Sequence, residues 1–107
     1  MLEELGLTYE SKYLDFQKGE QKGEEHTKFN PNGRIPVLVD RLRDNFVVFE
    51  TAAILLYLQQ FYDKENKFGF DKDKEANDYS EQLQWIFFAV SYRVCPAPIY
   101  AHKLWLI

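Results

Sequence analysis

Residues 30–51 constrain the fold of this chain more than any other stretch. Pro36 stands directly before the apolar run 37–39. A proline has no N–H to donate, so it is confined to the end or the edge of a strand. Residues 41–45 are polar, as in a hairpin loop, and 46–49 form a second β-favouring run. The stretch therefore predicts a turn, a two-stranded hairpin and then a helix that starts near Glu50.

The junction between the second strand and the helix is the chemically informative point. The N-terminus of a helix presents unpaired backbone N–H groups and the positive end of the helix dipole, and an anion can bind there. The Thr51 hydroxyl can add a donor to such an anion, and the Glu50 carboxylate can accept hydrogen bonds from an amine. The pair suits a zwitterion such as an amino-acid head group. Spacing alone favours the alternative, in which Glu50 or Thr51 caps the helix.

Composition narrows the function classes. The chain has 107 residues, 46% of them apolar, which allows one domain or one small domain with an appendage. Its 13 basic and 17 acidic residues give a net charge of −4, which argues against a nucleic-acid surface. No apolar run is long enough to span a membrane, and no secretory signal is visible. Cys95 is the single cysteine, so we expect no disulfide, no cysteine-built metal site and a cytoplasmic setting.

The remaining elements follow from local patterns. The clearest is a helix over 51–62, because its apolar side chains recur at helical spacing on one broad face. A second helix is expected from Asn77 or Asp78, with apolar residues on more than one side. We also expect the tail of a helix over 1–6, a strand over 7–16, a short helix around 24–29, a charged segment over 63–74, a helix end at Pro96 or Pro98, and another helix beginning within 101–107.

Two motifs carry a family resemblance. Residues 30–40 read Asn-Pro-Asn-Gly-Arg-Ile-Pro-Val-Leu-Val-Asp, and residues 49–58 read Phe-Glu-Thr-Ala-Ala-Ile-Leu-Leu-Tyr-Leu. They resemble the N-terminal domain of the glutathione-transferase family, whose consensus sequence is N-P-x-G-x-(V/I)-P-x-L-x-D followed by E-S-x-A-I-x-x-Y-L. Residues 14–16, 19–21 and 84–88 match as well. The closest similarity is to the fungal and bacterial branch that includes the yeast nitrogen-regulatory prion protein.

The resemblance implies an α/β fold that is truncated at both ends. We expect a thioredoxin-like glutathione-binding domain over 1–63, a linker over 64–76 and the start of an all-α domain over 77–107. The family's first strand lies in the middle of the sheet, and it should precede Met1. We therefore expect the strand over 7–16 to lack a partner and the strand over 37–40 to have an unpaired edge. Such a chain should be unstable or aggregation-prone alone.

The resemblance also implies a glutathione site. The Thr51 hydroxyl and N–H would take the α-carboxylate of the γ-glutamyl head, and Glu50 would face its amine. Ile35 would pair through its backbone with the cysteinyl part, and Pro36 would be the cis proline beside it. The family usually has Ser where Thr51 stands, so we expect binding with some loss of fit.

Two further residues are candidates for the glycyl end of glutathione. Gln21 aligns where relatives place His, Gln or Lys, and Arg34 is placed to attract a carboxylate from a distance. Solvent exposure is an equally good reading of both. The aromatic residues of the helix at 77–92 would line an apolar cosubstrate pocket or form core, and we favour core; these are Trp85, Phe87, Phe88 and Tyr92.

In the family the thiol-activating Tyr, Ser, Cys or Asn comes just after the first strand. That segment should precede Met1, so no residue of this chain inherits the catalytic role. Tyr9 and Tyr13 are expected to be packing residues, and Cys95 a buried small apolar residue. His26 and His102 have no spaced partner and receive no role. Residues 89–107 depart from the family pattern, so the resemblance does not assign the cosubstrate site.

We therefore expect a glutathione-transferase-like protein that binds glutathione as its cosubstrate and no metal. The complete protein would conjugate glutathione to a small electrophile or use it to reduce peroxides or disulfides. The alternatives are a non-catalytic regulatory or binding protein and an inactive remnant. We expect no nucleic-acid or membrane partner, and a homodimer, the rule in the family, is doubtful for this chain.

Overall fold

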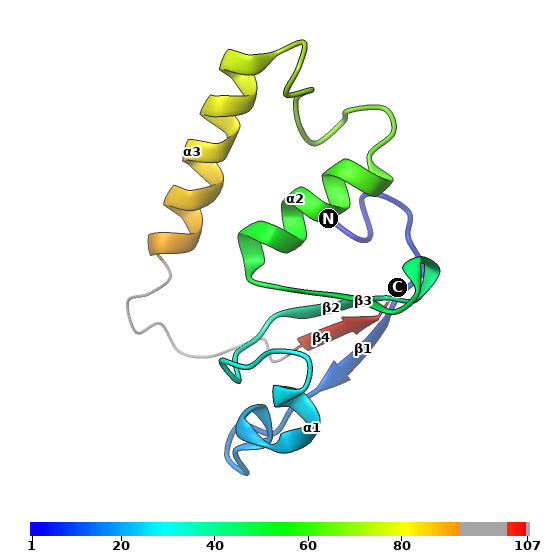
Figure 1. Cartoon of the computed structure of the whole chain (residues 1–107), viewed down its shortest axis with the longest axis vertical. Coiled ribbons are helices and arrows are strands. Elements are labelled where there is room, and N and C mark those ends of the chain that lie inside the picture. Colours follow the sequence, from blue (N-terminus) through cyan, green and yellow to red (C-terminus); the bar gives the residue numbers. More distant parts are fainter. Residues whose placement is uncertain (93–102, 107) are drawn as a thin grey trace.

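The fold is a mixed α/β arrangement, shown here by a computed structural model that describes residues 1–92 and 103–106 (Figure 1). In chain order the elements are β1 (Glu10–Tyr13), η1 (Glu20–Lys22), α1 (Glu24–Thr27), β2 (Val37–Asp40), η2 (Arg41–Arg43), β3 (Phe46–Phe49), α2 (Thr51–Tyr62), α3 (Ala76–Tyr92) and β4 (Lys103–Leu106).

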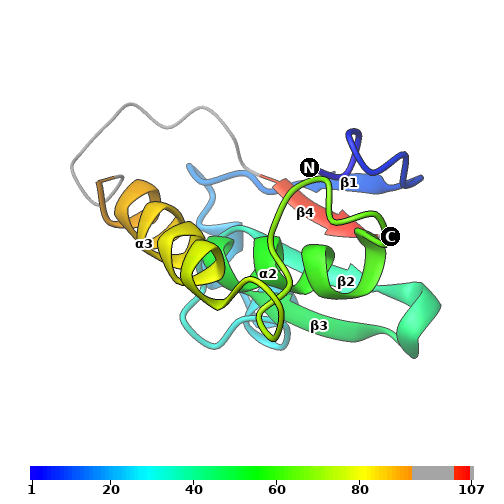
Figure 2. The ribbon, with the colours of Figure 1, turned by 90° about the horizontal axis from the view of Figure 1, so that it is seen from above.

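The four strands form one sheet in the order β1-β4-β2-β3. The hairpin predicted around residues 41–45 is present, because β2 and β3 pair antiparallel with Val37 opposite Phe49. β4 lies between β1 and β2, antiparallel to β1 and parallel to β2. Figure 2 shows it between these two strands. A strand from late in the sequence is therefore an interior strand of the sheet.

The two faces of β2 belong to two apolar clusters, because successive side chains of a strand point to opposite faces. Leu38 has no exposed surface and packs with Ile54 and Leu58 of α2 and with Leu2. Val37 and Val39 face the other way, where Phe29 packs against them. Figure 1 shows α2 and α1 on opposite sides of the sheet, in agreement with this alternation.

The helix predicted over 51–62 is confirmed, since α2 has these bounds. It ends at Tyr62 and is followed by Asp63, a buried residue whose carboxylate accepts hydrogen bonds from the N–H groups of Lys67 and Phe68. The segment after α2 is therefore folded back by a specific contact. The boundaries of a linker and of a second domain stay a prediction.

Three expectations about strands and helices are wrong. The expected helix over 101–107 is a strand at Lys103–Leu106. As a consequence β1 has a partner and β2 has no free edge on that side. Pairing to a strand on each side satisfies backbone groups that a short terminal helix would leave unpaired. The strand expected over 7–16 is shorter, with β1 at Glu10–Tyr13.

α3 differs from expectation at its start and in its burial. It begins at Ala76, one or two residues earlier than predicted. Trp85, Phe87 and Phe88 have 62%, 56% and 54% of their surface exposed, so the expectation that they form core is wrong. The reason is that α3 packs against α2 on one side, as Figure 2 shows, and these aromatic side chains stay largely exposed.

Several sequence features lie outside the described residues, namely Cys95, Pro96, Pro98 and His102, together with the Tyr92 side chain. Within the described part of the chain, no helix is long and apolar enough to cross a membrane.

Candidate functional site

The N-terminus of α2 carries no side-chain cap. Glu50 occupies the N-cap position with φ 75° and ψ 127°, and its side chain makes no capping hydrogen bond. The Glu50 carbonyl accepts the first helical hydrogen bond, from the Ile54 N–H at 2.9 Å. Glu50 and Thr51 are both exposed. Capping by these side chains is therefore the wrong reading, and the first N–H groups of the helix are open to an external anion.

A tight loop before β2 forms the second part of the site. The Ile35–Pro36 bond is cis, as the resemblance implied. The carbonyl oxygen of Arg34 accepts two hydrogen bonds, from His26 Nε2 at 2.9 Å and from Asn30 Nδ2 at 2.8 Å. The Arg34 side chain itself is exposed. The backbone of this loop is thus held from the inside, while its outer surface stays available.

The short helix η1 packs directly on the turn at 30–34. Lys22 Nζ donates to the carbonyl oxygen of Asn32 at 2.6 Å. A Cβ at Gly33, which has φ +56°, would lie 2.7 Å from the Gln21 carbonyl oxygen, so a side chain has no room there. Gln21 is half-buried, and its Oε1 has no hydrogen-bond partner among the described residues. The structure thus brings Gln21 beside the loop that holds Arg34.

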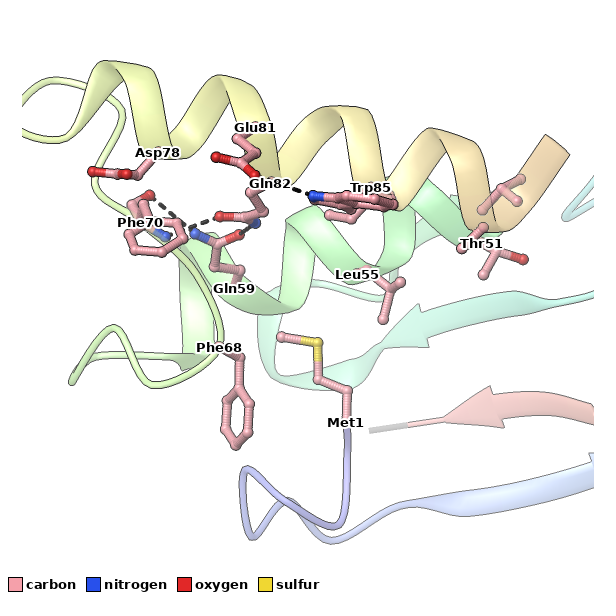
Figure 3. A pocket seen from close by; sticks show the side chains of 13 residues that line it. Met1, Thr51, Leu55, Gln59, Phe68, Phe70, Asp78, Glu81, Gln82 and Trp85 are labelled. Carbon is pink, nitrogen blue, oxygen red and sulfur yellow. Dashed lines mark hydrogen bonds between the residues drawn. The ribbon is translucent and has the colours of Figure 1, made fainter. Parts of the chain in front are cut away.

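A cavity of about 820 Å³ lies between α2 and α3 (Figure 3). Thr51 lines one end, and Phe70 lies toward the other end with the Gln59–Gln82 pair. Trp85 contributes an aromatic wall, and its Nε1 donates to Glu81 at 3.3 Å. Leu55 and Ile86 add apolar surface. The cavity can therefore accept an apolar group attached to an anion at the start of α2.

The tyrosines near β1 have structural contacts. Tyr9 packs beside the Leu38 cluster and donates its hydroxyl to Glu3 at 2.7 Å. That hydrogen bond to a carboxylate raises the Tyr9 pKa, the opposite of what a thiol-activating donor needs. Tyr13 is 66% exposed on β1, so the expectation that it is a packing residue is wrong. No cluster of three or more His, Cys, Asp or Glu suited to a metal occurs in the parts of the chain that are described.

His26 is the site residue that sequence reasoning missed. It is buried, with 3% of its surface exposed, although it lies in a polar segment. Its contact is with a backbone carbonyl eight residues later. Neither its spacing from other histidines nor its neighbours signals that contact.

Residues 1–60 match the family described as "Glutathione S-transferase, N-terminal domain". This chain belongs to the glutathione S-transferase family. Glutathione S-transferase 1 of Schizosaccharomyces pombe is 43% identical over 90 residues, which are 84% of this chain and 38% of that relative. The transcriptional regulator URE2 of Saccharomyces cerevisiae is 38% identical over 91 residues, 85% of this chain and 26% of the regulator.

A solved structure agrees with these relatives. The glutathione transferase URE2P6 from Phanerochaete chrysosporium, crystallised in complex with oxidized glutathione, has a TM-score of 0.78 and 43% sequence identity to this chain. The alignment covers 94% of this chain and 49% of that structure. The chain thus spans less than half the length of each of these three proteins. The family, its URE2-like branch and the thioredoxin-like fold are confirmed.

Proposed function

We propose that this chain binds glutathione between the cis-proline loop and the start of α2. The observation that carries the proposal is the uncapped N-terminus of a 12-residue helix with an exposed acid and hydroxyl beside it. The γ-glutamyl α-carboxylate accepts hydrogen bonds from the Thr51 hydroxyl and the helix N–H groups. The α-amine donates to the Glu50 carboxylate. An anion site beside a carboxylate suits a zwitterion and disfavours a simple phosphate.

The rest of the tripeptide extends along the loop. The backbone of Ile35, beside Pro36, pairs with the cysteinyl part. The exposed Arg34 guanidinium and the Gln21 amide lie on the side where the glycyl carboxylate ends. The thiol then points toward the cavity between α2 and α3, which has room for a small apolar electrophile.

The complete protein uses glutathione for conjugation, or for thiol-dependent reduction of peroxides or disulfides. Binding without turnover is the second candidate. It is favoured by one observation, that the hydroxyl of the half-buried Tyr9 already donates to Glu3 at an exposed site. An assay with an aryl halide and an organic hydroperoxide separates these candidates, because only the first gives glutathione-dependent consumption of either substrate.

Glu50→Gln tests the binding site without changing its size. Calorimetric titration with glutathione should show binding to the wild-type chain and about tenfold or weaker affinity for the variant, because a hydrogen bond to a charged group is lost. Glu4→Gln is the matched control, since Glu4 is an exposed acid away from the site. Equal affinities of the wild-type chain and Glu50→Gln would contradict the proposed site.

A further inference from the structure

His26 and Asn30 are two buried side chains that bind the same backbone oxygen. Their exposed fractions are 3% and 1%, and both donate to the Arg34 carbonyl. A carbonyl oxygen accepts hydrogen bonds and cannot donate, so the proton of the neutral His26 ring is on Nε2. The Nδ1 atom is then a buried acceptor, and it has no partner among the described residues.

If stability were its only purpose, this arrangement would be unfavourable. A buried polar atom without a partner lowers stability, whereas an apolar side chain would fill the same space without that penalty. Asn30 also has a second use, because its Oδ1 accepts from the Asn32 N–H at 3.0 Å. His26 has no such second use within the described chain. The bond to the Arg34 carbonyl is therefore what the imidazole contributes.

Fixing that carbonyl fixes the next N–H as well. The Arg34 carbonyl and the Ile35 N–H belong to one planar peptide group, and in a trans peptide they point in opposite directions. The cis bond of this loop is the following one, Ile35–Pro36. Because the carbonyl points inward to His26 and Asn30, the N–H of Ile35 points outward. It has no acceptor among the described residues.

We propose that His26 is a positioning residue that aims the Ile35 N–H at the cysteinyl carbonyl of glutathione. The inference rests on the proposed function, since it needs glutathione along this loop. Together with Asn30, His26 holds the peptide in its binding orientation before the ligand arrives. This pre-organisation improves affinity, because the loop loses less freedom on binding. His26 itself does not touch the ligand.

Two probes and three variants test this role. The probes are glutathione and γ-glutamyl methylamide, which keeps the head group and lacks the cysteinyl carbonyl. His26→Leu removes the donor, and His26→Gln retains an N–H that can reach the Arg34 carbonyl. Lys28→Leu is the control at the exposed residue directly after the same short helix. Circular dichroism melts establish that each variant is folded before titration.

We expect His26→Leu to weaken glutathione binding about three- to tenfold, the range for one neutral hydrogen bond. Its affinity for γ-glutamyl methylamide should stay unchanged. His26→Gln should restore glutathione affinity to within about twofold of wild type, and Lys28→Leu should match wild type. Equal losses for both probes, or no loss for either, would overturn the positioning role. A wild-type chain that binds neither probe would instead overturn the proposed function.

Discussion

Asp40 has no exposed surface, yet three donors satisfy its carboxylate. The hydroxyls of Tyr57 and Tyr62 donate to Oδ2 at 2.7 and 2.5 Å, and the Leu42 N–H donates to Oδ1 at 3.0 Å. The two tyrosines come from α2, while Asp40 ends β2. A buried charge with this many hydrogen bonds holds the helix to the sheet. It therefore helps to set where the N-terminus of α2, and with it Glu50, lies.

Tyr57→Phe should lower the free energy of unfolding at neutral pH by about 2 kcal/mol, because a hydrogen bond to a buried carboxylate is lost. The measurement is urea unfolding. Tyr9→Phe is the matched control, since its hydroxyl bonds to Glu3 at an exposed site, and it should cost less than about 0.5 kcal/mol. Equal losses in the two variants would contradict a special role of the Asp40 cluster.

The same tyrosine makes stability depend on high pH. Burial, and then the hydrogen bond to Asp40, raises the Tyr57 pKa from 10.0 to about 12. Above pH 10 the unfolded chain loses this proton while the folded chain keeps it. The Tyr57 contribution is thus complete below pH 10 and is lost between pH 10 and about 12, by up to about 1.4 kcal/mol per pH unit. Tyr57→Phe should make this decline of stability with pH shallower. Part of the decline should remain in the variant, because burial and the hydrogen bond to Asp40 also raise the Tyr62 pKa.

At the scale of elements, the sequence predicted those whose signals are local. The bounds of α2 followed from apolar spacing, and the hairpin of β2 and β3 followed from two β-favouring runs around a polar loop. β4 did not, because a short segment becomes a strand only when partners from distant residues pair with it. The role of His26 was hidden for the same reason, since its contact is tertiary. The positions of Glu50 and Thr51 at the start of α2 could be predicted, because the strand-to-helix junction is a local signal in the sequence.

Leu104→Pro should disrupt the sheet more than any change at its edge. Leu104 stands opposite Lys12 of β1 and Val37 of β2, so the strand has a neighbour on both sides. Proline removes a backbone donor and does not fit an interior strand. We expect a loss of about 3 kcal/mol or more, seen as a lower unfolding midpoint.

Leu104→Ala is the matched control for this change, because it keeps the backbone N–H. The difference between the two variants isolates the backbone contribution of β4. Equal midpoints for the proline and alanine variants would show that pairing by β4 does not hold the sheet together.

The whole molecule is less compact than its length suggests. Its radius of gyration is 14.9 Å, and its extents are 46 × 33 × 22 Å. A compact domain of this length has a radius of gyration of about 13 Å. α3 stands at the side of the molecule in Figure 1. The rings of Trp85 and Phe88 are 5.8 Å apart in an edge-on contact and are both largely exposed.

We expect the chain to self-associate through this aromatic surface of α3, since contiguous exposed apolar side chains favour association. Sedimentation velocity at increasing concentration should show a monomer–oligomer equilibrium that changes little with added salt. Phe87→Ser with Phe88→Ser should shift that equilibrium toward monomer. Leu42→Ser is the control, because Leu42 is a single apolar residue, 75% exposed, on the distant hairpin. Association that persists in the double variant would contradict this assignment.

The position of β4 in the sheet also has a consequence for biosynthesis. β1 and β2 are made early, but each meets β4 and neither pairs with the other. Until residues 103–106 have emerged from the ribosome, β1 and β2 therefore lack the strand that lies between them in the sheet. Pairings between such distant residues form slowly, because a long loop must close first. Molecular chaperones that shield strand edges would find their longest opportunity in this interval of translation.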